Sequence, residues 1–122
     1  MYKALLSKGV VMQTKITFRG MDHSDAIERY AHEKIAKLYK FFKKENQDSV
    51  FISMTVESHR EHHYFIAELK IKTSQYDVIA KKEGTEMYPV IDYVVATMEK
   101  EITHAKEKHV AGKKHGVVVR GL

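Results

Sequence analysis

Apolar and polar residues alternate in four segments of the chain, which is the pattern of strands with one buried face. The segments are Lys15–Arg19, Val50–Glu57, Tyr64–Lys72 and Tyr76–Lys81. Only short polar stretches separate the last three segments, so we expect these strands to form consecutive antiparallel hairpins.

Two other segments place apolar residues three and four positions apart, as an amphipathic helix requires. The first begins after Ser24, a favourable N-cap residue, and its apolar arc ends at Phe42. The second begins after Gly84, with Pro89 in the first turn, and its helical pattern ends at Gly112. In both predicted helices most of the lysines lie opposite the apolar stripe.

The predicted order of elements is therefore β-α-β-β-β-α. The helical crossover makes the first two strands parallel, whereas the hairpins make the other pairs antiparallel. Each strand has one apolar face, so the simplest packing puts both helices on the same face of the sheet. The expected fold is an α+β two-layer sandwich with a four-stranded mixed sheet.

A chain of 122 residues fits one domain. We expect residues 12–110 to form it, 1–11 to be an N-terminal appendage that the native protein need not contain, and 111–122 to be a basic C-terminal tail. The sequence has no cysteine, which excludes disulfides, thiolate chemistry and cysteine-based zinc sites. No apolar stretch approaches the roughly 18 residues of a membrane span, and a cytoplasmic location fits this composition.

The net charge of +5 is unevenly distributed along the chain. Residues 1–23 and 24–44 each carry +3 and residues 100–122 carry +4, whereas residues 45–99 carry −5. Such segregation favours a surface that faces a polyanion. Lysines spread over two helix faces suit a phosphate backbone, and A-form RNA is recognised largely by shape and backbone. The alternative is that these lysines only keep the helix faces solvated.

The sequence gives little support for catalysis. It contains no phosphate-binding loop, dinucleotide-binding, GxSxG or HExxH pattern, so we predict neither an enzyme nor a cofactor. His59, His62 and His63 lie close together in the connection before Tyr64 and could offer imidazoles to a metal, as in a metal-dependent hydrolase. An exposed polar turn is the interpretation that we favour, so no metal site is predicted.

Three stretches resemble the ribosome hibernation-promoting factor family, which includes the ribosome-associated inhibitor and is also known as the σ54 modulation protein family. They are MQTKITFRGMDHSDAI, KIAKLYKFF and AKKEGTEMYPVIDYVVATMEKEITHAKEKH, and the resemblance covers about residues 12–109. The most specific part is the Met87-Tyr88 pair followed by Ile91-Asp92, and the triplet Ala36–Leu38 is a second family mark.

The resemblance implies a non-enzymatic protein that binds the small ribosomal subunit and its rRNA, covering the mRNA channel and the A and P tRNA sites. Such binding stops translation sterically and stabilises inactive ribosomes under stress such as stationary phase. Residues 12–110 would then be the ribosome-binding domain, and neither DNA nor a membrane would be a partner. The basic tail resembles the short hibernation-promoting class, which works with a separate ribosome modulation factor. Whether ribosome dimers or inactive single ribosomes result stays open.

The resemblance places rRNA contacts on both helices, at the end of the last strand and in the tail. The predicted contacts are Arg29, Lys37, Lys40, Lys44, Lys81, Lys82, Lys100, His104, Lys106, Lys108, Lys113 and Lys114. The apolar run Val117–Val119 has no assigned role. A general structured-RNA-binding module or RNA chaperone is the alternative, and it would bind any structured RNA with comparable affinity.

Overall fold

The computed structural model describes residues 3–7 and 10–115, with side chains described for 12–46 and 48–108. The strands are β1 (Lys3–Ser7), β2 (Val10–Arg19), β3 (Phe51–His59), β4 (Tyr64–Lys72) and β5 (Asp77–Gly84). The helices are α1 (Asp25–Ala36) and α2 (Met87–His115), with short 3-10 helices η1 (Tyr39–Phe42), η2 (Gln47–Ser49) and η3 (Arg60–His62).

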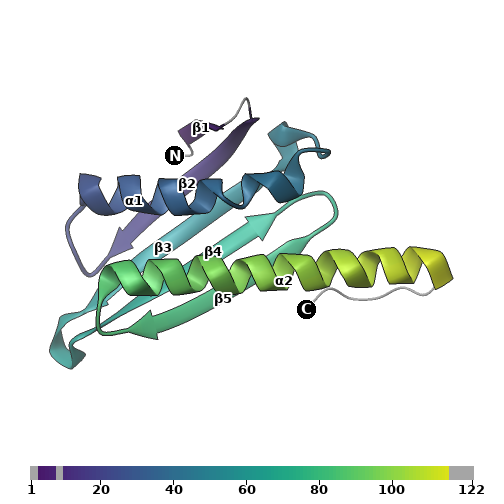
Figure 1. The fold of residues 1–122 in the computed structure, drawn as a ribbon. Coiled ribbons are helices and arrows are strands. Elements are labelled where there is room, and N and C mark those ends of the chain that lie inside the picture. Colours follow the sequence, from purple (N-terminus) through teal and green to yellow (C-terminus); the bar gives the residue numbers. More distant parts are fainter. Residues whose placement is uncertain (1–2, 8–9, 116–122) are drawn as a thin grey trace.

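The strands form one mixed sheet in the order β1-β2-β3-β4-β5, and both helices cover the same face (Figure 1). β2 and β3 are parallel, whereas the other neighbouring pairs are antiparallel. α2 packs over β4 and β5, and α1 lies beside α2 and contacts β2. The predicted α+β class and the predicted order of elements are therefore confirmed.

An additional strand lies at the edge of the four predicted ones. Lys3–Ser7, within the predicted appendage, forms β1 and pairs antiparallel with the first half of β2. β2 itself begins at Val10, five residues before the predicted start, and its residues Met12 and Thr14 are fully buried. Since the backbone groups of a long strand need partners, β1 satisfies an edge that the four-stranded sheet would leave open.

The first helix is shorter than its apolar arc. Ser24 caps it as predicted, its hydroxyl accepting a hydrogen bond from the backbone N–H of Ile27 (3.2 Å). The α-helix ends at Ala36, and η1 then continues the chain with tighter winding. This winding brings Tyr39 into the core, where its hydroxyl lies 3.2 Å from that of Thr14. A continuous α-helix would leave Tyr39 at the margin of the apolar stripe.

The second helix is longer than predicted, because α2 continues through Gly112 to His115. A single glycine costs a helix only about 1 kcal/mol relative to alanine, and the neighbouring alanine and lysines favour helix. Val117–Val119 lies outside the described residues. In the described part of the chain neither helix is long and apolar enough to cross a membrane.

The core lies between the sheet and the helices, where most of the predicted inward positions are buried and Ile16, Phe18, Phe65 and Tyr76 are partly buried. The central contributions are Ile52, Met54, Val56, Leu69, Ile71, Ile91, Val94, Met98 and Ile102, all at most 1% exposed. The opposite face of the sheet is not covered by any helix in the described residues, and Ile79 there is 56% exposed. The charged surface of the helices and the uncovered face of the sheet are therefore two separate surfaces.

Candidate nucleic-acid interface

The outer surface of the helices begins where α1 and α2 are joined by a polar contact. The hydroxyl of Tyr30 donates a hydrogen bond to the Asp92 carboxylate (2.7 Å), and the Lys34 ammonium lies 3.6 Å from the same carboxylate. The hydrogen bond to Asp92 raises the pKa of Tyr30, and the negative charge of Asp92 raises the pKa of Lys34. Tyr88 packs edge-on against Tyr30, so this end of the helix pair is held by aromatic contact as well.

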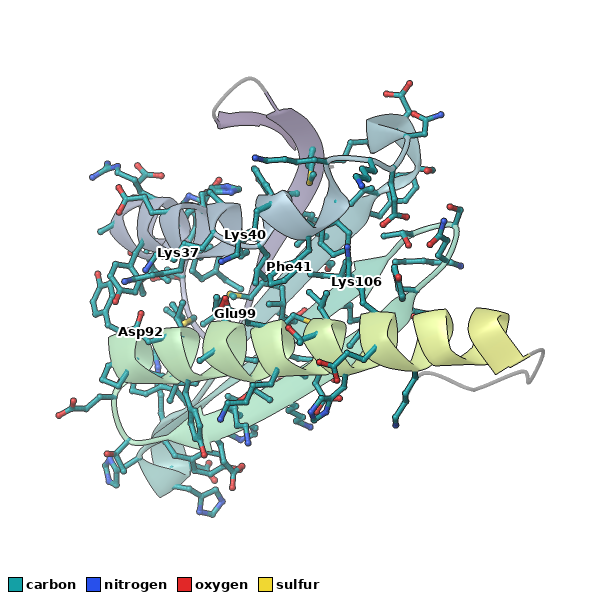
Figure 2. The ribbon with its side chains drawn as sticks, turned by 45° about the vertical axis from the view of Figure 1, so that its right-hand side comes forward. Lys37, Lys40, Phe41, Asp92, Glu99 and Lys106 are labelled. Atoms are coloured by element: carbon teal, nitrogen blue, oxygen red, sulfur yellow. The ribbon has the colours of Figure 1, made fainter. Side chains whose placement is uncertain are left out.

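Further along, α2 is joined to η1 and its flanking residues. Lys40 lies 3.4 Å from Glu99, and the Lys106 ammonium donates a hydrogen bond to the backbone carbonyl of Phe41 (Figure 2). The same ammonium lies 5.9 Å from the ring centre of Phe41 and 6.0 Å from those of Phe42 and Tyr76. Lys106, predicted to contact rRNA, is therefore a packing contact between the elements.

The residues of α2 that make these contacts share one side of the helix. Asp92, Glu99 and Lys106 are seven positions apart, which is close to two helical turns. Sequence reasoning identified Lys106 as a cation but missed Asp92 and Glu99 as its companions on this side. The seven-residue spacing is the signal that could have found them.

The other predicted contacts in and next to the helices face solvent. Arg29, Lys37, Lys44, Lys100, His104 and Lys108 are exposed, and we call these six residues the basic helix surface. Three of them, Lys100, His104 and Lys108, are four positions apart and form a line along α2. The structure thus leaves half of the predicted contacts accessible, with Arg29 on α1, Lys37 and Lys44 in the segment that follows it, and the other three on α2.

The two predicted lysines of β5 point to opposite faces of the sheet, since neighbouring strand residues alternate. Lys82 lies on the helix side, with its ammonium 4.5 Å from the ring centre of Tyr93 on α2. Lys81 lies on the uncovered side, opposite Glu68 of β4. The structure therefore does not bring Lys81 to the basic helix surface. Lys113 and Lys114 belong to the end of α2, but their side chains lie outside the described ones.

One group of possible metal ligands occurs among the described residues, at the start of α1. The His23 Nε2 atom lies 2.8 Å from a carboxylate oxygen of Asp25 and 3.0 Å from one of Glu28. Carboxylates in the first turn of a helix also interact favourably with its dipole, so the cluster is explained without an ion. In the β3–β4 connection, His59 contacts the Glu57 carboxylate and stacks on Tyr64 instead of converging with His62 and His63.

The fold and this surface define a class: a two-layer α+β domain whose paired helices present exposed cations on one side. The sequence profile of the family described as "Sigma 54 modulation protein / S30EA ribosomal protein" matches residues 14–110. The chain belongs to this family, whose members are ribosome-associated and not enzymes.

The curated relatives carry one name. The chain is 30% identical over 99 residues to the ribosome hibernation promoting factor of Azotobacter vinelandii, covering 81% of this chain and 87% of that protein. It is 29% identical over 97 residues to the protein of that name from Escherichia coli K12, covering 80% and 96%.

Two solved structures share the fold. The N-terminal domain of Thermus thermophilus Protein Y superposes with a TM-score of 0.62 at 20% identity, over 72% of this chain and 91% of that one. A ribosomal subunit interface protein from Coxiella burnetii gives a TM-score of 0.60 at 18% identity, over 77% and 99%. At this identity they support the architecture alone.

Proposed function

We propose that the protein is a cytoplasmic ribosome hibernation factor that binds the small ribosomal subunit over the mRNA channel and the A and P tRNA sites. The observation that carries the proposal is the basic helix surface, which offers exposed basic residues from α2, from α1 and from the segment that follows α1. The family and the names of its curated relatives support the same function. Binding of mRNA and tRNA is then prevented sterically, and inactive ribosomes are stabilised under stress.

The mechanism requires no bond to be made or broken. Each lysine or arginine that reaches a phosphate releases condensed counterions, and these small gains add up over the surface. The contacts of α2 with Tyr30 and Lys34 hold α1, and those with Lys40 and Phe41 hold η1. Because these elements are packed together before binding, ordering free energy is spent on the exposed side chains and not on assembling the helices.

The structure divides the predicted rRNA contacts by availability. Lys40 is paired with Glu99, but its side chain is 60% exposed, and such a pair is worth only about 0.2–1 kcal/mol, so a phosphate can replace Glu99. Lys106 holds the helices together and is not proposed as an rRNA contact. Lys82 and the basic residues Lys113 and Lys114 would extend the surface at its two ends, whereas Lys81 faces elsewhere.

The decisive experiment is a sucrose gradient of the protein with vacant bacterial ribosomes. We expect the protein to co-migrate with the small subunit, and the triple variant Lys37→Glu, Lys100→Glu and Lys108→Glu to stay at the top. A matched control reverses three exposed lysines of the uncovered sheet face, Lys70→Glu, Lys72→Glu and Lys81→Glu, and should still co-migrate. Equal loss in both variants would show that only net charge matters and would refute the surface assignment.

Two further measurements refine the proposal. Adding ribosome modulation factor shifts single ribosomes into dimers if the protein belongs to the promoting class, and leaves them single otherwise. A second candidate function, general binding of structured RNA, is favoured by the exposed lysines, because such side chains contact phosphates without reading bases. It predicts that an unrelated structured RNA competes as well as the small subunit, which the hibernation proposal excludes.

A further inference from the structure

A pocket of about 400 Å³ lies at the end of the sheet, away from the middle of the basic helix surface. Its walls come from the β3–β4 connection that contains η3 and from the loop between β5 and α2, which lie next to each other in Figure 1. Thr85 contributes from that loop, so the pocket adjoins the start of α2. A volume of this size is within the range of small-ligand sites, roughly 300–1,000 Å³.

One wall of the pocket is aromatic. His59 and Tyr64 are directly paired across β3 and β4, and their rings are stacked with centres 4.7 Å apart and planes 3° from parallel. The Glu57 carboxylate contacts the His59 ring and restrains it further. Two stacked and restrained rings form a flat surface that is in place before any ligand arrives.

The rest of the lining is mixed, with Phe65 adding an apolar side chain beside polar ones. Arg60 and His63 line it and are exposed, and Thr85 adds a hydroxyl. His63 adopts a left-handed backbone conformation (φ 54°) that residues other than glycine rarely take, which fixes the direction of the chain as it enters β4.

The base of this connection is anchored to the rest of the fold. Gly20, with φ of 67°, lies so close to β3 that a Cβ atom there would be 2.5 Å from the carbonyl oxygen of Ser58. Ser58 itself lines the pocket. Because any other residue at position 20 would displace this contact, the loop after β2 can support the wall of the pocket only with glycine at that position.

We propose that this pocket binds an unpaired ribonucleotide, with its base on the His59–Tyr64 stack and its phosphate at Arg60 and His63. Flat aromatic rings next to cations are the combination that proteins use for unstacked bases. The nucleotide can come from rRNA, in which case the inference rests on the proposed function, or it can be free in solution. In the first case the pocket adds a stacked pair of rings to the exposed basic side chains of the helices.

The test is an NMR titration of the isotopically labelled full-length protein with AMP and with the single-stranded oligoribonucleotide A5. We expect shift changes at residues 58–65 and at Thr85. Arg60→Ala and Tyr64→Ala should each weaken A5 binding about five-fold or more, in line with loss of one stacking or phosphate contact. Glu61→Gln is the matched control, because Glu61 is an exposed residue of the same turn and does not line the pocket.

Each outcome decides the inference. Comparable affinity for AMP and A5 identifies a free nucleotide as sufficient, whereas binding of A5 alone identifies RNA. Shift changes confined to the helices, or equal effects of Arg60→Ala and Glu61→Gln, would overturn the pocket while leaving ribosome binding intact. Failure of the wild-type protein to co-migrate with ribosomes, together with A5 shifts at residues 58–65, would refute the proposed function and leave the pocket standing.

Discussion

Two sides of α2 carry charge, and they use it differently. On the side facing α1, Asp92, Glu99 and Lys106 contact Tyr30, Lys34, Lys40 and the carbonyl of Phe41. On the solvent side, Lys100, His104 and Lys108 are exposed. Glu99 and Lys100 are neighbours in sequence, yet one joins two elements of the fold and the other is available to a partner.

The comparison shows that residue type alone does not assign a lysine to binding. Lys106 and Lys108 are two residues apart and would look equivalent in any count of basic residues. One rotates inward over Phe41 and Phe42, and the other points outward. Position around the helix axis, which advances about 100° per residue, decides whether a charge stabilises the fold or the complex.

The largest effect is expected on the third, buried side of α2. Val94→Asp would bury an uncompensated carboxylate at a position that is now 0% exposed, at a cost of several kcal/mol. We expect loss of the cooperative thermal transition and of ribosome binding together. A cooperative thermal transition in the variant, measured by circular dichroism, would contradict the placement of Val94 in the core.

The second prediction separates Glu99 from Lys100. Lys100→Gln removes one phosphate contact, so binding weakens and the slope of log affinity against log salt flattens by about 0.7–0.9. Glu99→Gln releases Lys40 and removes a nearby negative charge, so binding should tighten modestly. Ribosome affinity measured from 50 to 200 mM salt checks both. Weakening by both variants would show that Glu99 acts through helix packing instead of through Lys40.

Much of the fold was predictable because the apolar pattern is regular. Val50, Ile52, Met54 and Val56 alternate without interruption, and all four are fully buried. β1 was missed because Lys3–Ser7 gains its structure by pairing with β2, and a partner is not visible in a local pattern. The end of α1 was missed because the winding of η1 depends on how Tyr39 packs against Thr14, a contact between residues 25 positions apart.

The site was predictable only as a set of cations. The amphipathic pattern placed Lys100, His104 and Lys108 on the exposed face of α2, as the structure shows. The role of Lys106 depends on the Phe41 carbonyl, which comes from a separate element. The face of the sheet on which Lys81 lies depends on the alternation of residues along β5. The aromatic pocket at the β3–β4 connection was not predictable, because the stacking of a histidine on a tyrosine depends on the register of two strands and not on spacing.

The third prediction compares two lysines of α2, Lys106 and Lys108. Lys106→Met keeps most of the aliphatic stem but loses the hydrogen bond to Phe41 and the attraction to three rings, so stability should fall by about 1–2 kcal/mol. Lys108→Met should leave stability within about 0.5 kcal/mol and weaken ribosome binding instead. Urea denaturation and ribosome affinity, measured on both variants, test this contrast. A larger change in the free energy of ribosome binding than in that of unfolding for Lys106→Met would contradict the prediction.

The smallest expected effect is a pH dependence at the Asp92 end of the helix pair. Asp92 raises the pKa of Tyr30 and of Lys34 in the folded protein, so the folded state keeps protons that the unfolded state has begun to release above about pH 10. The contribution to stability is therefore present at neutral pH and declines as the pH rises through the two folded-state pKa values.

Asp92→Asn removes the principal cause of both shifts, so the stability of the variant should decline less steeply above about pH 10. Burial raises the pKa of Tyr39 and Tyr76 in the same direction, but these residues are unchanged in the variant and cancel in the difference. Urea midpoints of both proteins from pH 8 to 11 should therefore converge as the pH rises. Parallel curves of urea midpoint against pH would show that Asp92 holds the helices without favouring the protonated forms of Tyr30 and Lys34. The side of α2 that faces α1 would then act through geometry and not through charge.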